Sequence, residues 1–541
     1  MKETMSTPQS SVFLNGSEVI PARIVIGVTG HRRLAPKPWL TDEIRSAVQR
    51  IGQMAPPLKH TPLVLTILSP LAEGADRLVA QEVLKVSGSR LEVILPMDKD
   101  DYIQDFTTAK SRQEFEQLLS QAAGVRRVWL KGSRPEVYEM VGRYVVEQCD
   151  VLIALWDGTP LAGEGGTAGA VEYARKTGCP LIWINTDIPG QVTYELGEGL
   201  SPRPFRDLEE YNTQQVDRTK FQERTRELHD FFMGKASDEE LDCDRMQPTF
   251  EYVVRHYVRA DMLALHYEHL YYWMESVMYV LALLAIVVAG VQILFLPEHP
   301  EILISEVVLM LVVLSIFWAG QRQRWHGKWI DCRFLAERFR SALFMAVANT
   351  EIATLRPPRY LSLAYSSRDW MVAAFSSFWS HRPRIGAADS SSWDCVRRFL
   401  CKAWIEDQIR YHGGVSERHY RRHHRMVVAS YVLFALTICV ALLHILKVGP
   451  HAAENAFAFM AIVFPAIGAS IAAIRTHRDY LRNSMRATEM VRHLQELRDE
   501  MMKVQDCGSF LGLLKGTEET MLRENEDWRV VVRFNTPEAP A

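Results

Sequence analysis

Short apolar runs alternate with amphipathic stretches along the N-terminal part of the chain. The runs are four to seven residues long and rich in β-branched side chains: Arg23–Thr29, Leu63–Leu68, Leu91–Leu95, Arg127–Leu130, Val151–Trp156 and Leu181–Asn185. Nearly continuous apolar runs of this length are typical of strands that are covered on both faces. Helix-length segments such as Ala72–Val86 and Pro135–Gln148 separate them. This alternation predicts a doubly wound parallel α/β sheet.

The second half of the chain carries four longer apolar runs. They are Ser276–Leu296, Ile302–Ala319, Met426–Ile445 and Ala456–Ile474. Each is close to the roughly 20 residues that cross a hydrocarbon core about 30 Å thick. Buried pairs of soluble helices are the alternative, but four runs of matched length disfavour it. We therefore expect an all-α membrane region with four transmembrane helices.

The two apolar pairs belong to a repeated pattern. Each pair encloses a short loop and precedes a charged helix in which apolar residues recur at alternating spacings of four and three, which is typical of a helix-packing seam. The repeats are offset by about 150 residues, with His326 matching His477, Trp329 matching Tyr480, Glu337 matching Glu489 and Arg340 matching Arg492. We expect the seams to pack the two repeats together or against another subunit. The seams are Trp325, Trp329, Cys332, Ala336, Phe339 and Leu343, and then Ala487, Met490, Leu494, Leu497 and Met501.

Charges beside the apolar runs predict the orientation in the membrane. The loop Pro297–Glu306 holds three glutamates and no lysine or arginine. Basic residues gather at the opposite ends of the runs: Arg322, Arg324, Lys328, Arg333, Arg418, Arg421, Arg422, Arg425, Arg475, Arg478 and Arg482. The positive-inside rule then places both termini and the sheet domain in the cytoplasm.

Composition excludes several classes of site. The net charge of -3 gives no reason to expect nucleic-acid binding. The eight cysteines are scattered without a CxxC pair, so we expect reduced thiols and neither a disulfide framework nor a zinc site. His419 and His423 are four residues apart but lie among arginines, which disfavours a bound cation. No metal site and no resident cofactor are expected.

These patterns divide the chain into seven parts. A partly helical linker, with a helix from about Asp207 to Phe232, joins the sheet domain to the membrane region. The expected parts are a polar tail at 1–22, the sheet domain at 23–187, the linker at 188–249, a first two-transmembrane module at 250–350, a connector at 351–400, a second module at 401–530 and a tail at 531–541.

Candidate ligand-binding residues follow three of the predicted strands. In a doubly wound sheet, ligands bind in the loops beyond the carboxyl ends of the strands. Glycine lets backbone N–H groups approach a phosphate, a helix N-terminus adds partial positive charge, and arginine or histidine donates charge-assisted hydrogen bonds. Each loop by itself is also explained by ordinary turn chemistry. The candidates are Gly30, His31 and Arg32 after the first strand, Ser69, Gly74 and Asp76 after the second, and Asp157, Gly165, Gly166 and Thr167 after the fifth.

Residues 23–187 resemble the SLOG superfamily, which includes Lonely Guy and DprA-type proteins. The resemblance rests on GVTGHR, LSPLAEGADRLVA, LPMDKDDYIQDF, DVLIALWDG and GEGGTAGAVEYAR taken together. It implies a Rossmann-like domain that binds a nucleotide or a nucleotide-derived signal. Enzymatic Lonely Guy members carry PGGxGTxxE, whose glutamate is catalytic. Here Ala170 occupies that position, which favours a sensor with no catalytic residues over a phosphoribohydrolase, although Glu172 or Glu73 is a possible substitute.

Residues 250–530 resemble a tandem duplication of the SLATT family, the SMODS- and SLOG-associating two-transmembrane effector domain. This resemblance rests on the two-helix architecture and on the matched helix positions given above. It implies a bacterial inner-membrane effector of antiphage defence, in which a homo-oligomer forms a pore or perturbs the bilayer when the sheet domain binds its signal. The alternatives are a membrane-anchored nucleotide-processing enzyme and a membrane scaffold whose sheet domain binds protein.

Overall fold

The computed structural model of the chain describes residues 18–34, 37–127, 132–159, 166–197, 199–348, 369–383, 385 and 393–534. It divides into two compact units. The first contains Met1–Gln215 and Thr354–Arg382, and the second contains Val216–Ala353 and Pro383–Ala541. We call them the sheet unit and the helical unit.

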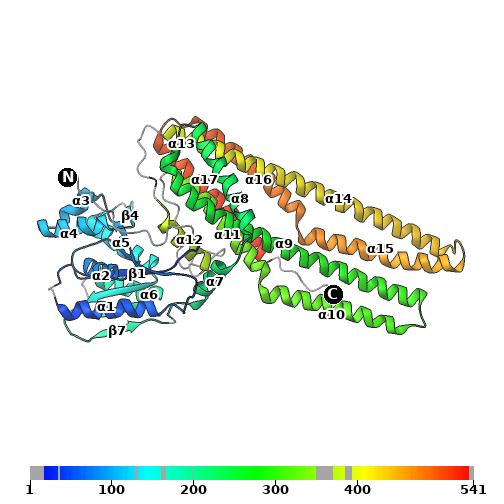
Figure 1. Ribbon diagram of the computed structural model, residues 1–541, viewed down its shortest axis with the longest axis horizontal. Coiled ribbons are helices and arrows are strands. Elements are labelled where there is room, and N and C mark those ends of the chain that lie inside the picture. Colours follow the sequence, from blue (N-terminus) through cyan, green and yellow to red (C-terminus); the bar gives the residue numbers. More distant parts are fainter. Residues whose placement is uncertain are drawn as a thin grey trace. The chain divides into compact units, whose positions relative to one another are not determined.

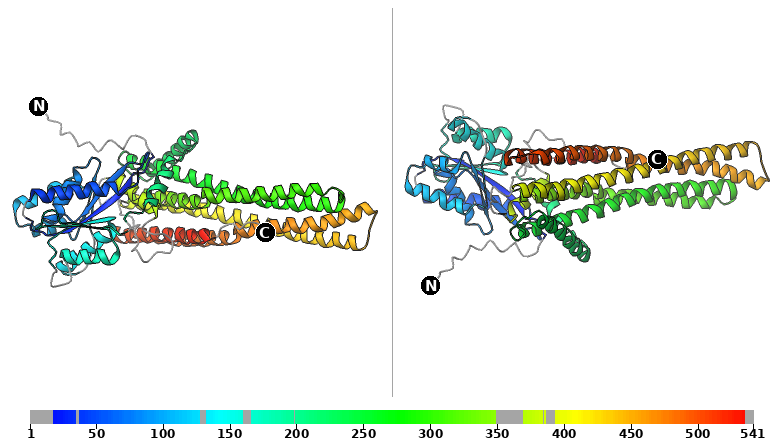
Figure 2. Two further views of the ribbon diagram at one scale, coloured as in Figure 1. Left: turned by 90° about the horizontal axis from the view of Figure 1, so that it is seen from below. Right: turned by 90° about the horizontal axis from the view of Figure 1, so that it is seen from above.

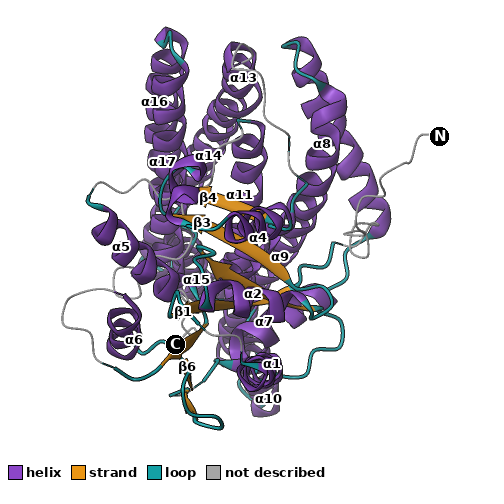
Figure 3. Cartoon of the chain, turned by 90° about the vertical axis from the view of Figure 1, so that its left-hand side faces the viewer, coloured by secondary structure: helices purple, strands orange, loops and turns teal. Residues whose placement is uncertain are grey.

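The sheet unit is built on one seven-stranded sheet with the order β4-β3-β2-β1-β5-β6-β7. All neighbouring strands are parallel except β6 and β7. The predicted doubly wound parallel sheet is therefore confirmed (Figure 1). The strands, drawn in orange in Figure 3, are β1 (Ala22–Gly30), β2 (Leu63–Ser69), β3 (Arg90–Leu95), β4 (Gly124–Arg127), β5 (Val151–Trp156), β6 (Leu181–Asn185) and β7 (Val192–Glu195).

The fourth strand differs from its predicted position. It begins at Gly124 and pairs with β3 through Arg127, whereas the apolar run began at Arg127 and continued into residues 128–130, which lie outside the described residues. This strand is at the edge of the sheet and is only partly buried, so apolar content was a poor guide to its limits. The antiparallel edge strand β7 was not predicted at all.

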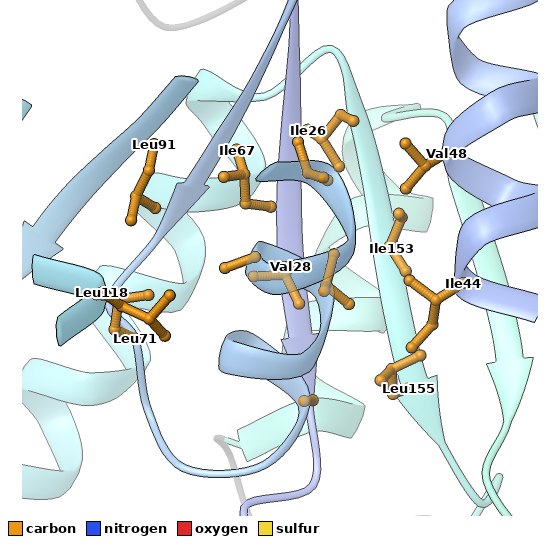
Figure 4. Packing of buried hydrophobic residues seen from close by; sticks show 14 of the residues in the cluster. Ile26, Val28, Ile44, Val48, Ile67, Leu71, Leu91, Leu118, Ile153 and Leu155 are labelled. Atoms are coloured by element: carbon orange, nitrogen blue, oxygen red, sulfur yellow. The ribbon is translucent and has the colours of Figure 1, made fainter. Parts of the chain in front are cut away.

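Helices cover both faces of this sheet. Side chains of β1 alternate between the faces, as the two-residue period of a strand requires. Ile26 and Val28 pack on one face with α1, α2 and α4, as Figure 4 shows, whereas Val25 packs on the other face with α5 and α6. The helices of the unit are α1 (Pro38–Gln53), α2 (Ala75–Leu84), α3 (Lys99–Tyr102), η1 (Ile103–Asp105), α4 (Ala109–Ser120), α5 (Arg134–Gln148), α6 (Gly166–Thr177), α7 (Pro202–Thr213) and α12 (Trp370–His381).

Helix α12 joins the sheet unit from a distant part of the sequence. The ring of Trp370 lies 5.3 Å from that of Tyr211 in α7. Ser377 Oγ donates a 2.7 Å hydrogen bond to the carbonyl oxygen of Pro21, just before β1. Phe378 is completely buried. The sheet unit is thus assembled from two stretches of chain that are separated by the first predicted membrane module.

The helical unit contains long helices and no strand among its described residues. The predicted linker helix Asp207–Phe232 is wrong, because the chain forms two helices there, and Asp217 starts the second by accepting hydrogen bonds from the amides of Thr219 and Lys220. The helices are α8 (Arg218–Asp238), α9 (Cys243–Phe295), η2 (Pro300–Ile302), α10 (Leu303–Gln323), α11 (Trp325–Val347), α13 (Trp393–Leu400), the π-helical turn η3 (Cys401–Ile405), α14 (Glu406–Ile445), α15 (His451–His477), α16 (Tyr480–Lys503) and α17 (Cys507–Phe534).

The four apolar runs lie in α9, α10, α14 and α15. Four helices of the described chain are long and apolar enough to cross a membrane. Both α10 and α15 pack against α9, and α15 also packs against α14 (Figure 2). Large apolar side chains remain exposed along α10 and α14, among them Val307, Leu311 and Phe434. Such a surface is unfavourable in water and suits lipid contact, in agreement with the predicted membrane region.

A left-handed residue marks the same point in both repeats. Arg324 (φ 55°) separates α10 from α11, and Asp479 (φ 50°) separates α15 from α16. These positions are 155 residues apart (324 and 479), so the offset of about 150 was slightly wrong. His326 lies after its bend and His477 before its own, so the two are not equivalent. Each seam helix packs chiefly along a helix of its own repeat, α11 along α9 and α16 along α14, whereas packing between the repeats or against another subunit was expected.

We expect Phe378→Ala in α12 to destabilise the sheet unit by about 3–5 kcal/mol, because it empties a completely buried aromatic site. Hydrogen exchange of the detergent-solubilised chain should then accelerate in β1 and α7, which α12 contacts, and remain unchanged in α10. Ser376→Ala, at a half-buried position of the same helix, is the matched control. Unchanged exchange in β1 with Phe378→Ala would contradict the role assigned to α12.

Candidate functional site

A cleft of about 780 Å³ opens beyond the carboxyl ends of the central strands. Strand β1 pairs with β2 on one side and with β5 on the other. The order of the strands therefore reverses its direction at β1. Crevices of doubly wound sheets form at such a switch point. Residues that line the cleft include Gly30, His31, Arg32, Asp76, Tyr102, Tyr138, Trp156, Gly166, Thr167, Glu172 and Tyr173.

The floor of the cleft depends on close packing between β1 and the start of α2. The amide of Ala75 donates a 3.1 Å hydrogen bond to the carbonyl oxygen of His31. A β-carbon on Gly30 would lie 2.4 Å from that of Ala75, and one on Gly74, where φ is +79°, would lie 2.4 Å from the carbonyl oxygen of His31. Both glycines are therefore required by packing between elements. Gly30 also lines the cleft, whereas Gly74 lies beneath it.

Asp76 is the buried acid of the cleft. Its Oδ2 accepts hydrogen bonds from Ser69 Oγ at 2.9 Å and from the amide of Ala72 at 3.3 Å. Burial raises the pKa of Asp76 from 3.8 to about 6, and the rise is limited by these two hydrogen bonds and by the charges of Arg32 and Arg77. A carboxyl group with such a pKa exchanges its proton close to neutral pH, which is typical of functional sites.

The loop between β2 and α2 contains strained backbone. Leu71 has a φ of 58°, in the left-handed region that a residue with a branched side chain rarely adopts. Its amide donates a 2.9 Å hydrogen bond to Ser69 Oγ, and its side chain is fully buried in the core shown in Figure 4. These contacts offset a strain of about 1–3 kcal/mol, and they fix the loop that carries Asp76.

Histidine and arginine from the β1 loop occupy the rim of the cleft. His31 Nε2 lies 3.2 Å from Asp157 Oδ1 and accepts a 3.2 Å hydrogen bond from the amide of Asp157. The hydrogen bond from the amide of Thr159 lowers the pKa of Asp157. The guanidinium of Arg32 is exposed and stacks 4.7 Å from the ring centre of Tyr138. The guanidinium of Arg32 and the ring of Tyr138 thus lie side by side at the rim of the cleft.

Helices α5 and α6 form the walls of the cleft. Helix α6 begins at Gly166, where φ is +72°, and Thr167 is its second residue, so its N-terminus opens at the cleft. Glu172 is exposed on the same helix. Arg143 of α5 lies 5.5 Å from the ring centre of Tyr173. The cleft therefore combines the positive end of a helix with aromatic rings and exposed charge.

The structure brings nine of the ten predicted residues to one place. Six line the cleft, Ser69 and Asp157 contact two of those six, and Gly74 packs under the floor. Gly165 lies outside the described residues. Sequence reasoning missed the side chains of α5, notably Tyr138 and Arg143, because they lie within a helix that opposes the strand ends. The sequence carries no local signal that distinguishes them from ordinary surface residues of a helix.

A buried arginine next to Asp76 has a structural role. Arg77 is buried, and its Nε donates to the carbonyl oxygen of Leu71 at 3.1 Å. Its Nη1 donates to Ser111 Oγ at 2.9 Å and to Glu114 at 3.2 Å. These bonds tie α2 to α4, so Arg77 stabilises the loop behind the cleft and does not line it.

No group of three or more possible metal ligands occurs within the described residues. No protein-family model matches the chain, and no curated protein matches it.

We expect Gly30→Ala to destabilise the sheet unit by about 1–3 kcal/mol, because the added methyl group would contact Ala75 and the carbonyl oxygen of Leu155. Gly142→Ala is the control, since a β-carbon there meets nothing within 4 Å inside α5, and it should stabilise the helix by up to about 1 kcal/mol. The unfolding temperatures of the two variants in detergent test this. Equal temperatures would show that Gly30 is not required by packing.

We expect Asp76→Asn to stabilise the sheet unit at pH 7.5. The folded-state pKa of about 6 exceeds the ordinary 3.8, so the folded chain binds the extra proton between these values and loses stability as pH rises through this window. The loss amounts to about 3 kcal/mol at neutral pH, and asparagine, which has no charge to bury, avoids it. Unfolding temperatures measured at pH 4.5 and 7.5 should differ from wild type mainly at pH 7.5. A larger difference at pH 4.5 would contradict the assigned burial.

Proposed function

We propose that the chain is a membrane effector whose sheet unit binds a nucleotide or nucleotide-derived signal in the switch-point cleft. The observation that carries this proposal is the cleft itself, in which the N-terminus of α6, the Arg32 guanidinium and the buried Asp76 meet at the ends of β1 and β5. A volume of about 780 Å³ falls within the roughly 300–1,000 Å³ of small-molecule sites.

The groups in the cleft suit the parts of a nucleotide. The first turn of α6 offers unpaired backbone N–H groups to a phosphate, and Gly166 allows close approach. Arg32 adds a charge-assisted donor beside that turn. The rings of Tyr138, Trp156 and Tyr173 line the same cleft and offer faces on which a base stacks. The resemblance of residues 23–187 to SLOG domains supports the same ligand class.

In this proposal the four apolar helices form the effector part. Basic residues gather where the apolar runs lead into α11 and α16 and just before the apolar run in α14. This distribution of charge supports an inner-membrane protein with both termini in the cytoplasm. The exposed apolar side chains of α10 and α14 contact lipid or a second copy of the chain. Ligand binding acts by favouring one of two arrangements of a homo-oligomer, which forms a pore or perturbs the bilayer. The resemblance to tandem SLATT domains supports a role in bacterial antiphage defence.

A membrane-anchored nucleotide-processing enzyme is the second candidate. The specific observation in its favour is Glu172, which lines the cleft on α6 near the position of the Lonely Guy catalytic glutamate. Glu73 is a weaker candidate, because Ser111 Oγ donates a hydrogen bond to it and it is not among the residues that line the cleft. Breakdown of a bound nucleotide by the wild-type chain, lost in Glu172→Gln, would favour this function.

The test is a thermal-shift panel with the full-length chain in detergent, using AMP, ATP, NAD, ADP-ribose and cyclic di- and trinucleotides. A ligand at a hundred times its Kd stabilises the native state by about 2.7 kcal/mol, so a binder should raise the unfolding temperature by several degrees. Gly166→Glu should abolish the shift, since it places a carboxylate at the N-terminus of α6. Gly190→Glu is the control. Gly190 has a similar positive φ, a β-carbon there meets nothing within 4 Å, and the residue lies outside the cleft lining. This variant should therefore bind the ligand as wild type does.

The same panel separates the candidate functions. A stabilising ligand that stays intact, and that triggers dye release from liposomes containing the chain, supports the effector. A ligand that is consumed supports the enzyme. Absence of any shift across the panel would refute nucleotide recognition and leave the scaffold as the better account.

A further inference from the structure

The buried carboxyl group of Asp76 has one oxygen that the protein uses and one that it does not. Oδ2 accepts both hydrogen bonds, from Ser69 and Ala72. Oδ1 accepts no hydrogen bond from the described residues, and it is not fully enclosed by the protein. Asp76 lines the cleft although only 5 % of its surface is exposed. Its unused oxygen therefore faces the cleft at the end of a fixed side chain.

The surroundings of Asp76 determine what kind of donor suits this oxygen. The positive charges of Arg32 and Arg77 already act on the carboxyl group, so a cationic donor would be repelled by both. Tyr102, which also lines the cleft, is nearly fully buried beside it. A neutral hydroxyl meets the need for a donor at Oδ1 without adding charge.

The rest of the cleft indicates that the ligand also carries negative charge. Two cationic side chains of the lining are already paired with acids, Arg143 with Glu139 and Arg175 with Glu195, both at 2.6 Å. Arg32 and Lys176 also line the cleft and form no ion pair within the described residues, so their positive charge is available to a ligand. A molecule with phosphate for the α6 end and a sugar hydroxyl for Asp76 satisfies both requirements.

We infer that Asp76 Oδ1 accepts a hydrogen bond from a ribose hydroxyl of the phosphorylated ligand, so that the cleft distinguishes ribonucleotides from their deoxy counterparts. This inference rests on the proposed function and identifies the ligand class of the same site. Asp76 acts as a specificity-determining residue, and Ser69 acts through it by holding Oδ2 and so orienting Oδ1.

The experiment compares ribonucleotides with deoxy analogues in binding to the full-length chain in detergent. The probes are AMP and cyclic di-AMP, each with its 2′-deoxy and 3′-deoxy counterpart, and Kd is measured by calorimetry. A hydrogen bond to a charged acceptor makes wild type bind a ribonucleotide roughly tenfold to a hundredfold more tightly than one of its deoxy forms. In Asp76→Asn the amide oxygen stays with Ser69 and Ala72, and the amide nitrogen faces the ligand. A neutral hydrogen bond is about half as strong, so the ratio should fall to roughly threefold to tenfold.

Asp42→Asn is the matched control, because Asp42 is exposed in α1 and pairs with Arg45 at 2.9 Å. It should leave the ratio unchanged. The variant at position 76 is expected to fold, since asparagine occupies the same volume and keeps both hydrogen bonds at Oδ2.

The outcomes separate this inference from the function on which it rests. Equal binding of ribo- and deoxynucleotides by wild type, or a ratio that Asp76→Asn leaves intact, would overturn the hydroxyl contact while nucleotide recognition stands. Binding of neither probe, nor of any member of the wider panel, would overturn both.

Discussion

The N-terminus of α2 rests on the carboxyl end of β1 at a separation that leaves no room for a β-carbon at position 30 or at position 74. Gly30 and Gly74 permit this approach, and the hydrogen bond from Ala75 to His31 holds it. Because α2 begins here, Asp76 lies within reach of Ser69 at the end of β2, and Arg32 projects over the opposite wall. The positions of the polar groups in the cleft thus follow from one steric constraint between backbones.

The same packing forces an acid into a site that disfavours its charge. Asp76 is buried, and Leu71 beside it adopts a left-handed conformation. Each feature lowers the stability of the sheet unit, and each is retained by contacts that fix the β2–α2 loop. Strain and unfavourable burial of this kind are features of sites whose groups are held ready for a ligand. The cleft therefore combines the shape of a crevice with a buried acid and a strained loop.

Sequence patterns predicted the parts of the structure that depend on local chemistry. Strand β5 matched its apolar run from Val151 to Trp156, and the three strand-end loops were found because their polar residues interrupt apolar runs. Long-range contacts were not predictable in this way. The aromatic run of α12 gives no local sign that Trp370 packs against Tyr211. The sequence also does not indicate whether a glycine such as Gly74 makes room for a phosphate or for a carbonyl oxygen. The partly exposed edge strand β4 was misplaced for the related reason that its burial depends on its neighbours.

The assembly of the sheet unit from two stretches of chain has a consequence for synthesis at the ribosome. Helix α12 begins at Trp370 and α10 ends at Gln323, so 46 residues separate the completed first hairpin from the last helix of the sheet unit. At about 5–20 residues per second, the hairpin is synthesised roughly 2–9 seconds before α12 is available. The strip around Pro21 and Tyr211 that α12 contacts stays uncovered during this interval. The fold of the sheet unit is therefore completed only after the first pair of apolar helices has been synthesised.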